Sequence, residues 1–149
     1  MSVTNGFGAP IPGRGASINP PNRFEGLHVE VDPDLPPEEK PNPKTQFYFD
    51  ATESVLTANE SPDVGYAMGL NCYRGCEHGC AYCFARPFHE YLGWSSGLDF
   101  ETKILVKTRA PDLLRQELSR PKCRPQVVGM SGVTDCYQPA ERHFQLTRR

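Results

Sequence analysis

Four of the six cysteines stand within twelve consecutive residues, and their spacing is the chemically most informative feature of the sequence. Cys76, Cys80 and Cys83 form a Cys-x3-Cys-x2-Cys pattern directly after a predicted strand, with Gly75 and Gly79 beside them. Glycine lets a loop fold tightly about a cluster, and thiolates are the usual ligands of iron–sulfur clusters. Three thiolates that bind three irons of a 4Fe–4S cluster leave the fourth iron free to coordinate a substrate or cofactor. The pattern therefore favours an open 4Fe–4S cluster.

Two other uses of these thiols remain open. A structural zinc site takes four tetrahedral ligands, usually from two separated Cys-x2-Cys pairs, and only Cys80 and Cys83 form such a pair here. A redox-active Cys80–Cys83 pair would leave Cys76 without a role. The iron–sulfur interpretation is the one that uses all three thiols.

The remaining cysteines have no ligand spacing of this kind. Cys72 lies four residues before Cys76 and could serve as a fourth ligand, which would close the cluster and restrict it to electron transfer. Because Cys72 falls at the end of a predicted strand, we expect a packed free thiol instead. We expect Cys123 and Cys136 to be ordinary buried or surface thiols.

The elements that must position the cysteines predict an α/β fold. The predicted strands are 47–49, 65–71, 103–107 and 126–130, and the predicted helices are 85–91, 111–118 and a last one from 139. Strand, cysteine loop, helix, strand and helix follow one another, which is typical of α/β proteins. A complete (β/α) barrel takes about 250 residues. We therefore expect residues 45–149 to form the N-terminal portion of a partial (β/α) TIM-like barrel, an incomplete core domain that looks truncated at its C-terminus.

Residues 1–44 differ in composition from the rest of the chain. They hold nine of the 15 prolines, and we expect a Pro/Gly-rich, flexible N-terminal arm there, in which residues 13–24 are the stretch that could dock onto another surface. The arm has four basic and six acidic residues, and residues 45–149 have twelve of each. This balance leaves no electrostatic footprint for nucleic acid. Without a long apolar run or a visible secretory signal, we expect no membrane contact and a cytoplasmic protein with reduced thiols.

At this point the residues resemble a known family. The Cys76-x3-Cys80-x2-Cys83 pattern, with Tyr82 just before the third cysteine, is the signature of the radical S-adenosylmethionine (radical SAM) superfamily. The string from Tyr73 to Pro87 is similar to the spore photoproduct lyase-like branch, also called DNA-repair photolyase-like. Further segments resemble that branch: Gly13–Ala16, Asn22–Phe24, Gly97–Glu101, Ser131–Asp135 and Gln138–Glu141.

The resemblance implies an enzyme with two cofactors, a 4Fe–4S cluster held by Cys76, Cys80 and Cys83 and S-adenosylmethionine. Its chemistry would be reductive cleavage of S-adenosylmethionine to a 5′-deoxyadenosyl radical, which abstracts hydrogen from the substrate. Tyr82 would lie against the adenine. The place of the family's Gly-Gly-Glu-type motif is taken by Ser131–Asp135, so Ser131 and Asp135 are the candidates to hold the methionine amino group.

The resemblance also implies a low-potential electron donor of the flavodoxin or ferredoxin type, and it leaves the substrate unknown. A nucleic acid lesion is what the family label suggests, without independent support from the charge. Seven basic residues offer either a nucleic-acid face or a solvated surface: Lys103, Lys107, Arg109, Arg115, Arg120, Lys122 and Arg124. The alternative function is a truncated, non-catalytic iron–sulfur or zinc-binding module.

Three further residues near the cysteines have two interpretations each. His78 could donate a hydrogen bond to the cluster or relay protons, or it could simply be an exposed loop histidine. Arg74 and Arg86 could offset the negative charge of the cluster or contact the cofactor carboxylate, or they could be surface arginines.

Overall fold

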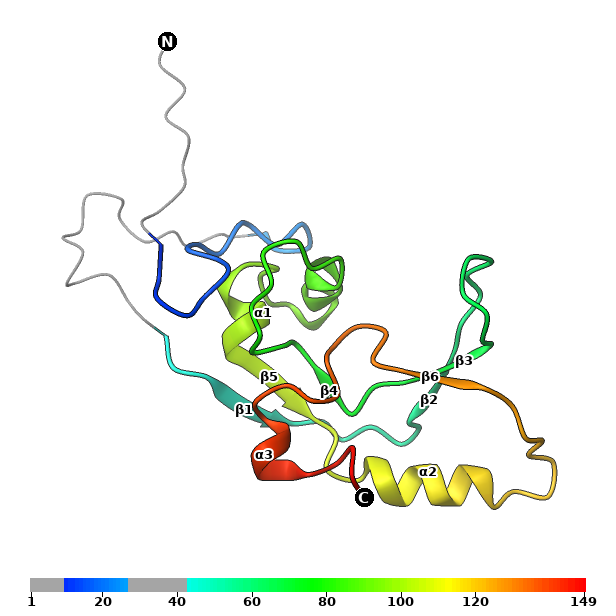
Figure 1. Cartoon of the computed structure of the whole chain (residues 1–149). Coiled ribbons are helices and arrows are strands. Elements are labelled where there is room, and N and C mark those ends of the chain that lie inside the picture. The colour runs from blue at the N-terminus through cyan, green and yellow to red at the C-terminus, as the bar shows by residue number, and fades with distance from the viewer. Residues whose placement is uncertain (1–9, 27–42) are drawn as a thin grey trace, which may run out of the picture.

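Two small sheets, with short helices beside them, make up the computed structural model, which describes residues 10–26 and 43–149 (Figure 1). In chain order the elements are β1 (Gln46–Phe49), β2 (Leu56–Ala58), β3 (Met68–Leu70), β4 (Tyr73–Arg74), the 3-10 helix η1 (Arg86–Leu92), α1 (Leu98–Thr102), β5 (Lys103–Val106), α2 (Ala110–Leu118), β6 (Val128–Met130) and α3 (Glu141–Phe144). The protein is therefore a mixed α/β fold.

Each sheet has three strands and one parallel pair. In the first, of order β1-β5-β4, β1 runs parallel to β5 from Gln46↔Lys103 to Phe49↔Val106, and β4 runs antiparallel to β5. In the second, of order β2-β3-β6, β3 runs parallel to β6 and β2 antiparallel to β3. The described residues form these two separate sheets and no closed barrel.

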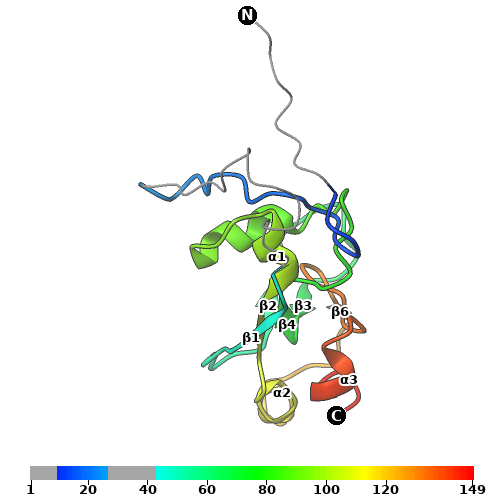
Figure 2. The same cartoon turned by 90° about the vertical axis from the view of Figure 1, so that its left-hand side faces the viewer.

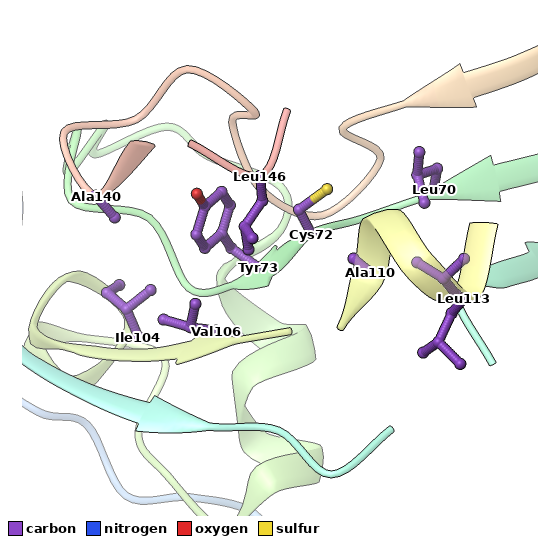
Figure 3. Close-up of a cluster of buried hydrophobic side chains, with 10 residues drawn as sticks. Leu70, Cys72, Tyr73, Ile104, Val106, Ala110, Leu113, Ala140 and Leu146 are labelled. Atoms are coloured by element: carbon purple, nitrogen blue, oxygen red, sulfur yellow. The ribbon is translucent and has the colours of Figure 1, made fainter. Parts of the chain in front are cut away.

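One main hydrophobic core joins β3, β4, β5, α2 and the C-terminal segment. Its buried members are Val55, Leu70, Cys72, Tyr73, Ile104, Val106, Ala110, Leu113, Ala140 and Leu146. Along β5, Ile104 and Val106 are buried while Lys103 and Leu105 are half-buried, as the two-residue period of a strand requires. Figure 3 shows the ring of Tyr73 beside Leu146, with Ile104 and Val106 on the neighbouring strand.

The predicted strands and helices are present, mostly in shorter form. The strand predicted over 65–71 is shortened to β3, and the helix predicted over 85–91 is the 3-10 helix η1. The helix predicted from 139 is the single turn α3, which ends where Gln145 adopts a left-handed conformation (φ 50°). Three elements, β2, β4 and α1, were not predicted, because elements of two to five residues are too short to show a periodicity.

Part of the predicted N-terminal arm lies against the domain. Residues 1–9 and 27–42 of the arm lie outside the described residues, so the domain division at residue 44 stays a prediction. Residues 10–26, which we call the N-terminal strap, run alongside η1 and α1 and are drawn in blue in Figures 1 and 2. The stretch singled out as able to dock, residues 13–24, belongs to this strap. None of the helices in the described ranges is long and apolar enough to cross a membrane.

Candidate functional site

The cysteine loop, residues 75–85, follows β4 and is attached to α1. The N–H of Cys76 donates to the carbonyl of Phe100 (2.9 Å). Gly75 and Gly79 have φ values of 83° and 63°, in the left-handed region that glycine tolerates best. Two turns place the cysteines in sequence, because the N–H of Gly79 donates to Cys76 O and that of Cys83 to Cys80 O. The loop therefore owes its course to the glycines predicted to shape it.

A second loop, residues 131–138, meets the cysteine loop at one sheet edge. It follows β6, which is the parallel neighbour of β3, and the carboxyl ends of parallel neighbours lie at the same edge. The N–H of Ser131 donates to Leu70 O (3.0 Å), and that of Val133 donates to the Asn71 side chain (3.0 Å). The hydroxyl of Thr134 donates to Gly75 O (2.7 Å). In α/β proteins this edge of a sheet is the usual place for an active site.

Gln138 is the most buried of the polar residues that connect these two loops, and its exposed fraction is 1%. Its Oε1 accepts from the N–H of Glu77 (3.0 Å). Its Nε2 donates to Gly75 O (3.3 Å) and to the hydroxyl of Thr134 (3.0 Å). The amide thereby satisfies backbone groups on both sides of Cys76, which are costly to bury without a partner.

Arg86 holds the other side of the cysteine loop. Its Nε donates to Cys80 O (3.0 Å), and its Nη1 donates to the carbonyls of Ser96 and Gly97. Its Nη2 lies 2.6 Å from Oε1 of the buried Glu101. Arg86 is therefore a structural ion-pair residue whose side chain is only 12% exposed, and its predicted contact with a cofactor carboxylate stays a prediction.

The three predicted cluster ligands are free thiols on this loop. Cys76 is buried, and Cys83 packs against the same small cluster, which contains Ala85 and Phe100. Burial raises the pKa of the Cys76 thiol, while the N–H groups of His78 and Asp135 lower it. Across residues 10–26 and 43–149, no three His, Cys, Asp or Glu side chains are already arranged to hold a metal ion. Thiol chemistry and spacing fit an iron–sulfur cluster, whose binding would draw these ligands together.

Cys72 belongs to the main core and is 4% exposed. Burial raises its pKa, and the nearby Glu141 carboxylate adds to that effect. This placement agrees with the expected packed free thiol. Cys123 and Cys136 are free and half-buried.

The candidate residues for binding S-adenosylmethionine differ in how closely they lie to the cysteine loop. Ser131, in a left-handed conformation (φ 74°), accepts from the N–H of Cys136 through its hydroxyl (2.8 Å). Asp135 accepts from the N–H of Tyr137 (2.7 Å), and its other oxygen lies 3.5 Å from Nε2 of His78. Both residues therefore lie on the loop that contacts the cysteines.

Tyr82 is the candidate with the fewest protein contacts, at 91% exposed. A ring this exposed on the cysteine loop is free to stack on a planar ligand. Arg74 is exposed, and its Nε lies 3.9 Å from the carboxylate of Asp50. No described contact brings Arg74 to the predicted ligands.

The predicted basic run does not form one continuous face. Lys107 is buried, and burial lowers its pKa. Lys103 pairs with Asp99 (2.9 Å) and Arg115 with Asp112 (3.2 Å). The solvated-surface interpretation describes the paired members better than a nucleic-acid face does.

Four residues that hold the cysteine loop were missed as site residues: Gly15, Glu101, Thr134 and Gln138. All four lie in the segments described above as resembling the family, which are Gly13–Ala16, Gly97–Glu101, Ser131–Asp135 and Gln138–Glu141. Their roles come from contacts across 15 to 86 positions of sequence, which no local spacing reveals.

No protein-family model and no solved structure matches the chain. The chain is similar to an uncharacterized protein of Mycobacterium tuberculosis, 51% identical over 77 residues that cover 52% of this chain and 23% of the relative; a Mycobacterium bovis protein matches equally. It is also similar to an uncharacterized protein of Methanocaldococcus jannaschii, 35% identical over 110 residues that cover 72% of this chain and 38% of the relative. The chain thus spans about a quarter of the length of the mycobacterial proteins it matches.

Proposed function

We propose that this chain carries the cluster-binding part of a radical SAM enzyme of the spore photoproduct lyase-like branch. Cys76, Cys80 and Cys83 would hold a 4Fe–4S cluster by three of its irons. When bound, the cluster supplies the electron that cleaves S-adenosylmethionine to the 5′-deoxyadenosyl radical, which takes hydrogen from the substrate.

The observation that carries the proposal is one loop of three free thiols held between two supporting segments. Gln138 and Thr134 bind the backbone on the side of Cys76, and Arg86 binds the carbonyl of Cys80. The three thiols form no disulfide and are available as ligands. Ligand binding and local ordering are coupled at metal sites, so the thiols need not be gathered before the cluster arrives.

The remaining candidate residues have roles that their positions support. Ser131 and Asp135 lie on the loop beside Cys76 and would hold the methionine amino group through a hydroxyl and a carboxylate. The exposed ring of Tyr82 would stack on the adenine. A low-potential flavodoxin or ferredoxin would deliver the electron.

The proposed architecture is the N-terminal portion of a partial (β/α) barrel. The parallel pairs β1–β5 and β3–β6 are the kind of unit from which such barrels are built. The loop with Ser131 and Asp135 follows β6, which pairs in parallel with β3, and β/α barrels carry their active sites in the loops after parallel strands. The matched regions cover 23% of the Mycobacterium tuberculosis relative and 38% of the Methanocaldococcus jannaschii relative, so both proteins extend well beyond the matched region.

The test is anaerobic reconstitution of the protein with iron and sulfide, followed by S-adenosylmethionine and dithionite and an assay for 5′-deoxyadenosine. We expect the nucleoside to form with wild type and to be absent with Cys76→Ala. Cys123→Ala is the matched control and should keep the activity. Stable zinc in place of iron, or a cluster that does not respond to S-adenosylmethionine, would favour a non-catalytic metal-binding module instead.

A further inference from the structure

Glu101 is a fully buried carboxylate, at 0% exposed, and three separate segments meet at it. It lies on α1, and its Oε1 is 2.6 Å from Nη2 of Arg86. Its Oε2 accepts a hydrogen bond from the N–H of Gly15 in the N-terminal strap (3.0 Å). A buried charge of this kind is tolerated only when it is paired and hydrogen-bonded, so Glu101 depends on both partners.

The contact with Arg86 connects Glu101 to the predicted middle ligand of the cysteine loop. The same guanidinium that pairs with Glu101 donates from Nε to Cys80 O. Because the guanidinium group of Arg86 is planar, it fixes the directions of its contacts with Glu101 and with Cys80 O together. The position of Glu101 therefore sets the position of the Cys80 backbone through one side chain.

The strap contacts the cysteine loop at Gly79, the residue before Cys80. A Cβ on Gly15 would lie 1.5 Å from Gly79 O, so the two backbones are in direct contact and no larger residue fits. Arg14 donates to Glu101 O (3.2 Å), which fixes the strap at the same point. The strap therefore covers the turn that leads into Cys80.

Side-chain contacts further along hold the strap to η1 and α1. Asn19 exchanges two hydrogen bonds with Asp99, one from its amide to the carboxylate and one from the Asp99 N–H to its carbonyl. Asn22, which is 2% exposed, donates to the carbonyls of Glu90 and Trp94. The strap is thus a docked part of the fold at both of its ends.

We infer that Glu101 is a positioning residue that couples docking of the N-terminal strap to the placement of Cys80 as a cluster ligand. The inference rests on the proposed function in one respect, that Cys80 is a ligand. Its physical content is that loss of the strap removes a hydrogen bond from a buried carboxylate and releases the Gly79 backbone. Arg86 then no longer holds Cys80 in one place.

Two variants and one control test the coupling in the apo-protein. Gly15→Ala inserts a methyl group against Gly79 and displaces the strap, and Glu101→Gln keeps the shape of the side chain but removes its charge. Gly26→Ala is the matched control, because a Cβ there meets nothing within 4 Å. The readouts are the rates of alkylation of Cys80 and Cys123 by iodoacetamide, measured by mass spectrometry under reducing conditions, and of trypsin cleavage after Arg14.

We expect Gly15→Ala and Glu101→Gln to raise the alkylation rate of Cys80 at least about tenfold, because local opening exposes the loop. Cleavage after Arg14 should rise with it, while Cys123 and the Gly26→Ala control stay within about twofold of wild type. An unchanged Cys80 rate in both variants would overturn the inference. An equal rise at Cys80 and Cys123 would also overturn it, since it would show global destabilisation only.

Iron content after anaerobic reconstitution separates this inference from the proposed function. If wild type takes up a cluster, we expect both variants to take up less and to show a broadened electron paramagnetic resonance signal, with Gly26→Ala like wild type. If wild type takes up a cluster and both variants match it in iron content and spectrum, the coupling is overturned and the proposed function stands. If wild type takes up no cluster, the proposed function fails, and the alkylation rates alone decide whether Glu101 positions Cys80.

Discussion

Cys72 and Cys76, only four positions apart, lie in two different buried clusters. Cys72 packs in the main core with Tyr73 and Val106. Cys76 belongs to the smaller cluster with Ala85 and Phe100. The short strand β4 stands between the two thiols and directs them into separate environments. A shared ligand role for Cys72 would require it to leave the core.

Cys72→Ala should therefore leave cluster binding intact. We expect the variant to bind as much iron after anaerobic reconstitution as wild type and to lose about 1 kcal/mol of stability, because a small buried group is removed from the core. Iron analysis and urea unfolding measure the two effects, with Cys76→Ala as the comparison that loses iron. Loss of iron in Cys72→Ala would establish Cys72 as a fourth ligand and point to an electron-transfer cluster.

Tyr73→Phe tests the buried polar contact in the main core. The hydroxyl of Tyr73 donates a hydrogen bond to the Glu141 carboxylate, which also accepts from the N–H groups of Leu146 and Thr147. Removing the hydroxyl leaves a buried carboxylate short of a donor, so we expect a loss of about 1–3 kcal/mol in urea unfolding. Tyr137→Phe, at an exposed ring, should stay within about 0.5 kcal/mol of wild type. Equal losses in the two variants would contradict this role of Glu141.

His89 should make stability depend on pH in the acidic range. Burial lowers its pKa from 6.5 to about 4, and the imidazole is 2% exposed. Between these values the unfolded chain binds a proton that the folded protein does not, so stability present above pH 6.5 falls as the pH is lowered to about 4. The full shift corresponds to about 3 kcal/mol. Urea unfolding of wild type and His89→Gln across this range measures the difference.

The control for that experiment is His143→Gln, since His143 is exposed. This variant should keep the wild-type slope of stability against pH, whereas His89→Gln should flatten it. The ring of His89 packs against Trp94 and Phe100, and its Nε2 makes no hydrogen bond to any described residue. Parallel curves for wild type and His89→Gln would show that the imidazole titrates normally in the folded protein.

Gly75→Ala and Gly93→Ala form a matched pair that separates backbone conformation from space. Both glycines are left-handed, with φ of 83° and 78°. At Gly75 a Cβ would also lie 2.9 Å from Phe100 O, whereas at Gly93 it meets nothing within 4 Å. We expect Gly93→Ala to cost about 1 kcal/mol and Gly75→Ala about 2–4 kcal/mol. Thermal or urea unfolding measures the loss of stability in each variant. Similar losses in the two variants would mean that the cysteine loop moves freely away from α1.

The candidate site and several elements were predicted from signals that are each local. The Cys-x3-Cys-x2-Cys spacing with its adjoining glycines is one such signal, and the β-branched residues of β5 are another. The helix α2 was predicted from Pro111 and Asp112 at its first turn, which suit an N-terminus whatever the rest of the fold does. The expected position of Cys72 in a packed environment follows from its place at a strand end.

The supporting residues could not be predicted, because each acts across a long sequence separation. The local sequence does not mark Glu101 as a buried residue, because its partners Arg86 and Gly15 lie 15 and 86 positions away along the chain. Gln138 became a bridge to Gly75 because β3 and β6 are parallel neighbours, which places their following loops at one edge. Composition predicted a flexible arm over residues 1–44, although residues 13–24, which include the docked Asn22, were singled out as the stretch that could dock.

By itself, the sequence determined which side chains are available for chemistry and in which short elements they lie, since ligand spacing, turn glycines and helix starts depend on neighbours along the chain. The tertiary structure alone decided which residues hold the cysteine loop and that the N-terminal strap lies over Gly79. The reason is physical: burial and pairing of Glu101, Gln138 and Cys72 depend on which strands become neighbours, and strand pairing is a property of the whole chain.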